Sequence, residues 1–154
     1  MSRLSQSPRK WAFIRRLIIG LLLAVLGCDF GIAAETVYTP KPGSLERKQI
    51  IIGLRAVVER ELKKPVMFRI DALKVHDGWA FLRGVPLETS GRKMNYRGTP
   101  YWEMIQAGMF DDWISALLHK EDKQWQVVVH SIGATDVPFT SWAERYQAPP
   151  DIFE

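Results

Sequence analysis

The chain has 154 residues, of which 47% are hydrophobic, and its 21 Lys and Arg residues outnumber 17 Asp and Glu to give a formal net charge of +4. This length and hydrophobic content fit one globular domain and exclude an intrinsically disordered chain. The single cysteine excludes an internal disulfide framework, and the 11 glycines exclude a collagen-like repeat.

The positive charge is concentrated at the N-terminus. Residues 1–16 contain five basic residues and no acidic ones, and an apolar run over residues 17–26 follows them. A basic region, a short apolar region and the small residues Ala33 and Ala34 are typical of a secretory signal, so we predict a signal peptide over residues 1–34. The apolar run is shorter than the about 20 residues that a membrane span requires.

Removal of residues 1–34 changes the charge balance. It takes away five basic residues and one acidic residue, which leaves sixteen of each kind and a formally neutral protein. Binding to nucleic-acid phosphates requires an excess of Lys and Arg, so this class of partner is excluded. Arg92, Lys93 and Arg97 form the densest remaining basic cluster, which we interpret as a solvated loop rather than an anion site.

Cys28 offers an alternative way of processing. It follows the apolar run at the position where bacterial lipoprotein signals carry their acylated cysteine, and Asp29 would then resemble an inner-membrane retention signal. The protein would in that case be an inner-membrane lipoprotein, attached to the membrane only by its lipid. Leu26 is bulky for such a signal, so we favour cleavage after Ala34 and a periplasmic or secreted protein.

A polar leader over residues 35–43 precedes the clearest predicted helix. Ser44 is a suitable N-cap, apolar residues recur at helical spacing over residues 50–62, and Pro65 prevents continuation. We expect this long helix to cover a sheet.

The first hairpin is predicted over residues 66–75 and 79–87. The Asp77-Gly78 pair between them is a strong turn signal, because both residues tolerate positive φ angles. The alternation of apolar residues changes phase near Asp71-Ala72, which predicts a β-bulge. Pro86 indicates an edge or the end of a strand.

A second hairpin is predicted over residues 113–119 and 125–134, with a polar turn between them. The segment 126–132 is rich in valine, and we expect it to be the central strand. Trp79 and Trp125 each open a strand and are expected to fill the core under the long helix.

Two short helices complete the pattern. Thr99-Pro100 opens one over residues 101–107, and a capping box formed by Ser141 and Glu144 opens another over residues 142–146. The element order predicts an α+β domain over residues 44–154: a long N-terminal helix packed on a curved antiparallel sheet of about four strands, with the helices on one face. This order resembles that of the cystatin-like and nuclear transport factor 2-like folds.

Several short motifs resemble a set of small secreted bacterial proteins whose function is not established. The resemblance spans residues 42–153, and its motifs are Trp79-Ala80-Phe81-Leu82, Gly98-Thr99-Pro100-Tyr101, Phe110-Asp111-Asp112, Trp125 with Val127, Gly133-Ala134-Thr135-Asp136-Val137-Pro138, and Trp142 with Tyr146. It implies an exported single domain and carries over no catalytic residue.

The three histidines lack the spacing of a metal site, so no metal and no cofactor is predicted. We expect His76 to be exposed in the first hairpin turn. Counting from a turn near Asp122 places His119 and His130 within a few residues of pairing, so they could be cross-strand neighbours, with a solvated sheet face as the alternative.

The acidic candidate is Asp136, which follows the last predicted strand. It either forms an Asx-type turn before Pro138 or acts as a general base with His130 or His119 in a sheet-lined cavity. The adjacent Asp111-Asp112 pair is expected to terminate the preceding helix rather than bind a cation.

The sequence therefore leaves two functions open. We favour a non-catalytic binding module for an unidentified protein or small ligand of the cell envelope, with Tyr101, Trp102 and Trp142 as candidate binding residues. The alternative is a small acid–base enzyme, an isomerase or hydrolase, that uses Asp136 and a histidine. Nucleophile-elbow, Walker-type and Rossmann motifs do not occur in the sequence.

Overall fold

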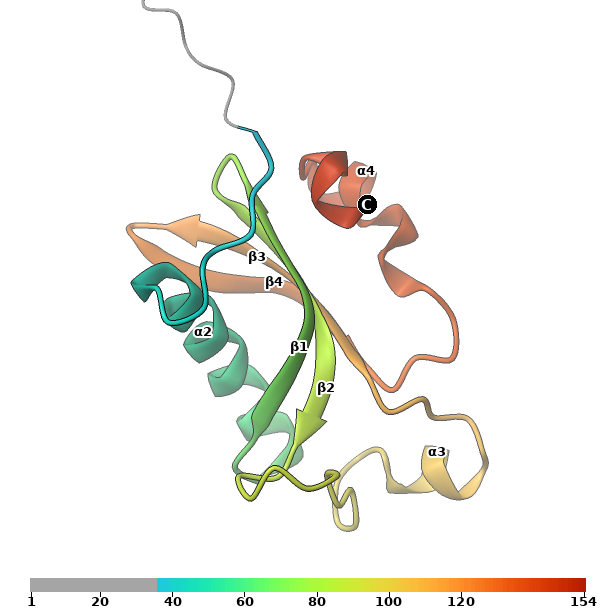
Figure 1. Ribbon diagram of the computed structural model, residues 1–154. Helices are drawn as coiled ribbons and strands as arrows, with labels where there is room; N and C mark the ends of the chain where they lie inside the picture. Colours follow the sequence, from blue (N-terminus) through green and yellow to red (C-terminus); the bar gives the residue numbers. More distant parts are fainter. Residues whose placement is uncertain (1–35) are drawn as a thin grey trace, which may run out of the picture. The chain divides into compact units, whose positions relative to one another are not determined.

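The computed structural model describes residues 36–154. The predicted signal peptide and Cys28 lie outside this range. The fold consists of a four-stranded antiparallel sheet with helix α2 (Leu45–Leu62) across one face (Figure 1). The order of strands in the sheet follows the chain: β1 (Met67–His76), β2 (Trp79–Leu87), β3 (Ile114–Glu121) and β4 (Gln124–Ile132). The α+β class and the order of the elements are thus as predicted.

Helix α2 begins and ends as its sequence predicts. The Ser44 hydroxyl accepts a hydrogen bond from the Arg47 amide at 3.3 Å, which satisfies one of the free N–H groups of the first turn. Lys63 then adopts a left-handed conformation that ends the helix before Pro65. Residues Ile50, Leu54, Val58 and Leu62 recur every four positions and are buried against the sheet. Among the described residues, no helix has the length and hydrophobicity that crossing a bilayer demands.

The first hairpin also confirms its local signals. Asp77 and Gly78 both have positive φ angles, 46° and 73°, as a tight two-residue turn between twisted strands requires. The register of β1 against β2 shifts between Ile70 and Ala72, where the bulge was expected. The second hairpin turns at Asp122 and Lys123, which also have positive φ angles.

The position of the valine-rich strand was predicted wrongly. Strand β4 lies at the edge of the sheet, and β2 and β3 are the central strands. Val127 packs in the core beneath α2, and Val129 packs in the cluster on the other face. The strand is rich in valine because both of its faces are covered, and this does not require a neighbouring strand on each side. A shift in the β3–β4 register leaves Val128 without a partner on β3.

The C-terminal segment covers the sheet face opposite α2, so the expectation that all helices share one face was wrong. It comprises η1 (Pro138–Ser141), α4 (Trp142–Tyr146) and η2 (Pro150–Phe153), and Figure 1 shows the sheet between α2 and these short helices. The predicted capping box is absent, because Ser141 is itself in a helical conformation at the end of η1 and its side chain makes no capping hydrogen bond.

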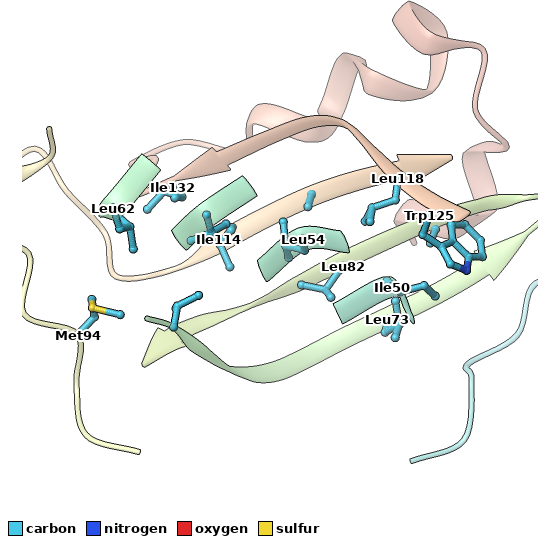
Figure 2. Packing of buried hydrophobic residues seen from close by; sticks show 14 of the residues in the cluster. Ile50, Leu54, Leu62, Leu73, Leu82, Met94, Ile114, Leu118, Trp125 and Ile132 are labelled. Atoms are coloured by element: carbon cyan, nitrogen blue, oxygen red, sulfur yellow. The ribbon is translucent and has the colours of Figure 1, made fainter. Parts of the chain in front are cut away.

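Two hydrophobic clusters therefore flank the sheet. Figure 2 shows the larger one, in which Leu54 of α2 packs with Leu82 and Ile114 of the central strands. The smaller one joins Phe81 and Leu117 to the C-terminal segment. The most deeply buried C-terminal residues of this second cluster are Trp142, Ala148 and Ile152.

The two strand-opening tryptophans lie on different faces. Trp125 is buried in the larger cluster under α2, as expected. Trp79 was placed there wrongly: it packs against the smaller cluster, and its ring lies 4.4 Å from that of His119. Successive side chains of a strand alternate, so the burial of Ala80 and Leu82 beneath α2 directs Trp79 and Phe81 to the other face.

Candidate functional site

A cavity of about 210 Å³ lies between the β2–α3 connection and helix α3 (Trp102–Gln106). Its apolar wall is formed by Met94, Tyr96, Trp102, Ile105 and Phe110. Its polar groups come from Lys93, Asn95 and Asp112. This end of the molecule, with α3 below the sheet in Figure 1, carries the least regular structure of the fold.

The connection that forms the cavity is held by hydrogen bonds between side chains and its backbone. The Lys64 ammonium group, just beyond α2, donates to the carbonyl oxygens of Asn95 at 2.5 Å and Arg97 at 2.7 Å. The Thr99 hydroxyl donates to the Tyr96 carbonyl at 2.7 Å and accepts from the Tyr101 amide at 3.3 Å. These contacts order the cavity wall without regular secondary structure.

Phe110 lines the cavity and packs directly on Gly133. A Cβ atom at residue 133 would lie 2.0 Å from the Phe110 ring, and this glycine has a φ angle of +75°. Only glycine meets both conditions at this position. The ring of Phe110 also lies 4.7 Å from that of Tyr96, at an angle of 64°. The tight turn after β4 therefore positions an aromatic wall of the cavity.

The polar end of the cavity is centred on the Asp112 carboxylate. The Tyr96 hydroxyl donates to one of its oxygens at 3.0 Å, and the Lys93 ammonium group lies 3.4 Å from the other. Burial, reinforced by the neighbouring Asp112 charge, raises the pKa of Tyr96 well above its usual value, so this hydroxyl stays a hydrogen-bond donor. Sequence reasoning assigned Asp112 to the end of a helix and missed this role.

A second polar cluster joins α2, β4 and the start of α3. The His130 Nε2 atom lies 2.6 Å from one oxygen of Glu61, and the Tyr101 hydroxyl donates to the other. Burial and the hydrogen bond to Glu61 raise the pKa of Tyr101 above its usual value. The cluster anchors Tyr101, and with it the neighbouring Trp102 of the cavity wall, to the long helix.

Glu61 was not among the predicted site residues. A sequence signal was nevertheless available, because Gly53, Val57 and Glu61 are spaced four residues apart and so lie on one side of the helix. Gly53 packs against the backbone of Trp125 on β4, and Glu61 contacts His130 on the same strand.

The acid–base residues proposed from the sequence do not come together. Asp136 is exposed in the turn after β4, and within residues 36–154 no hydrogen bond or ion pair joins it to His119 or His130. The two histidines are not cross-strand partners either: His130 pairs with Ala116 and faces α2, whereas His119 pairs with Gln126 and lies against Trp79 on the other face. The alternation of residues along β3 separates them.

The remaining candidates have different environments. Trp102 lines the cavity, whereas Trp142 is 5% exposed and fills the hydrophobic cluster beneath the C-terminal segment. His76 is half-buried rather than exposed, because its Nδ1 atom contacts the Asp151 carboxylate at 2.8 Å. Across the described part of the chain, His, Cys, Asp and Glu form no group of three or more that could hold a metal ion.

Comparison of the chain with models of protein families, with curated proteins and with solved structures finds no match. The functional interpretation therefore rests on the chemistry of the cavity itself.

Proposed function

We propose that the protein is an exported, non-catalytic binding module of the cell envelope and that the cavity between the β2–α3 connection and α3 is its ligand site. The observation that carries this proposal is the combination of a mostly aromatic wall with a single carboxylate held by Tyr96. Ligand sites typically pair apolar walls with a few polar groups that orient the ligand.

The size of the cavity limits the ligand. Its volume of about 210 Å³ lies below the range of about 300–1,000 Å³ that is usual for drug-sized ligands, which favours a small molecule or one side chain of a partner. The separation of Asp136 from both histidines favours binding over the acid–base reaction considered from the sequence. Export is supported by the signal pattern of residues 1–34.

The proposal is tested by screening a library of small aromatic and aliphatic compounds against the mature protein by two-dimensional NMR. We expect binders to shift the amide signals of residues 93–96 and 102–112 and to leave those of the C-terminal segment unchanged. Replacement Trp102→Ala should weaken binding about tenfold, the equivalent of one lost aromatic contact of ~1.4 kcal/mol.

Met104→Ala is the matched control, because Met104 is exposed on the same short helix and does not line the cavity. Helix α3 contains no buried residue, so neither replacement is expected to unfold the domain. A screen in which no compound shifts the cavity residues, or in which both variants bind equally well, would contradict the proposed site.

A further inference from the structure

We infer that the cavity selects small organic cations, with the Asp112 carboxylate binding the ammonium group of the ligand and the surrounding rings binding its apolar part. This inference rests on the proposed function and adds the class of ligand. It is argued from the charge, the burial and the hydrogen bonding of the lining residues.

Asp112 is the one acidic residue that lines the cavity, and its side chain is only 23% exposed. One carboxylate oxygen accepts the Tyr96 hydroxyl. A single neutral donor does not replace all the water that this charge loses on partial burial, so a cationic group beside the second oxygen is favoured. An ammonium group inside the cavity could take that position.

Lys93 shows where such a group can lie. Its Nζ atom is 3.4 Å from the second Asp112 oxygen, a long contact, and its side chain is 78% exposed. Ion pairs made by such exposed side chains contribute little to stability. Lys93 can therefore rotate into solvent, and a ligand cation can take its place at small cost.

The aromatic wall favours the same class of ligand. The cavity is lined by the rings of Tyr96, Phe110 and Trp102, and aromatic rings attract cations. The Arg97 guanidinium group already lies 5.2 Å from the centre of the Trp102 ring, so this ring accepts a positive charge in the free protein.

An anionic ligand is the competing choice, because Lys93 and Arg97 could attract it. Both of these cations are exposed and screened by water, whereas the negative charge of Asp112 is mostly buried. The less screened charge of Asp112 therefore favours a cation over an anion inside the cavity.

The experiment compares three probes of nearly equal size: benzylammonium, benzyl alcohol and benzoate. Each is titrated into the mature protein at low ionic strength, and the amide shifts of residues 93–112 are followed by NMR. We expect benzylammonium to bind at least tenfold more tightly than the neutral or the anionic probe.

Two variants with opposite effects sharpen the test. Asp112→Asn keeps the shape of the side chain and should abolish the preference for benzylammonium. Lys93→Met removes the competing ammonium group and should tighten benzylammonium binding severalfold. Lys48→Met controls for the change in net charge, because Lys48 is exposed on α2 and does not line the cavity.

Tighter binding of benzoate, with weaker binding in Lys93→Met, would show an anion site. Equal binding of benzylammonium and benzyl alcohol would show an apolar site. Either result overturns the inference of a cation site and leaves the proposed binding function standing. Absence of binding by all three probes also overturns this inference, and the wider compound screen then decides the proposed function separately.

Discussion

At the scale of single residues, the fold changes the acid–base behaviour of two tyrosines. Tyr96 is buried and Tyr101 is half-buried, and each donates its hydroxyl hydrogen to a carboxylate, Asp112 in the first case and Glu61 in the second. Burial is the larger cause and the carboxylate the smaller one, and both raise the tyrosine pKa. Both hydroxyls therefore stay protonated in the folded protein at pH values where a free tyrosine ionises.

Because the tyrosine pKa is higher in the folded protein than in the unfolded chain, we predict that alkaline pH destabilises the protein. In the unfolded chain both tyrosines release their protons near pH 10, so their contribution to stability is complete below about pH 10 and is lost as the pH rises above it. Urea unfolding should show a free energy of unfolding that falls between about pH 9.5 and pH 11. Tyr96→Phe and Tyr101→Phe should each make this fall shallower.

The free energy of unfolding is plotted against pH for each variant. Its slope below about pH 8.5, where free tyrosine is still protonated, serves as the reference for the slope at alkaline pH. The slopes are compared rather than the absolute stabilities, because each variant also removes the tyrosine donor from a carboxylate. An alkaline slope that is unchanged in the double variant would rule out this account of the two hydroxyls.

Residue-scale predictions from the sequence succeeded where the cause is local. The Ser44 cap and the Asp77-Gly78 turn depend on neighbours a few residues away. The contact between Glu61 and His130 joins residues 69 positions apart. The helical spacing places Glu61 on the same side of α2 as Gly53, but the packing of that side on β4 is not specified by a local pattern.

At the scale of elements, the close approach of α2 to β4 depends on Gly53. A Cβ atom at this residue would lie 2.6 Å from the Trp125 carbonyl oxygen, and the clash involves backbone that cannot rotate away. Glycine inside a helix normally costs about 1 kcal/mol relative to alanine, so its presence here indicates that the approach matters more than helix propensity.

We therefore expect Gly53→Ala to destabilise the domain by about 1–3 kcal/mol, the usual cost of overpacking, despite its better helix propensity. Urea unfolding measures the change in free energy of unfolding. Ala56→Gly on the exposed side of the same helix measures propensity alone and should cost about 1 kcal/mol. If Gly53→Ala instead raised the free energy of unfolding by about 1 kcal/mol, the space between α2 and β4 would accommodate a methyl group, which would contradict the predicted clash.

The strand pattern could be predicted at this scale, but the neighbours of each strand could not. Alternation within one strand reports which of its faces are buried. It does not report how many strands lie beside it, and for this reason the valine-rich β4 was expected in the centre and lies at the edge. The cavity was likewise beyond local patterns, since Lys93, Trp102 and Asp112 meet only through the tertiary path of the β2–α3 connection.

At the scale of the whole molecule, the proposal of export makes a prediction about the mature chain. We expect the protein from fractionated cells to begin at Glu35 and to have the intact mass of residues 35–154. Processing at Cys28 would instead add a diacylglycerol or triacyl mass and place the protein in the membrane fraction. Cys28→Ser should leave the mass of the mature protein and its fractionation unchanged, and a loss of membrane association in this variant would favour the lipoprotein.

The second face of the sheet can be covered only after the C-terminal segment has been synthesised. Residues 45–132 contain α2 and all four strands. Phe81 and Leu117 on the second face of the sheet remain exposed to solvent until residues 138–153 have been synthesised and can cover them. At about 5–20 residues per second, synthesis of residues 133–153 takes roughly 1–4 s after β4 is complete. The growing chain thus passes through an interval with exposed apolar surface, which a chaperone can bind.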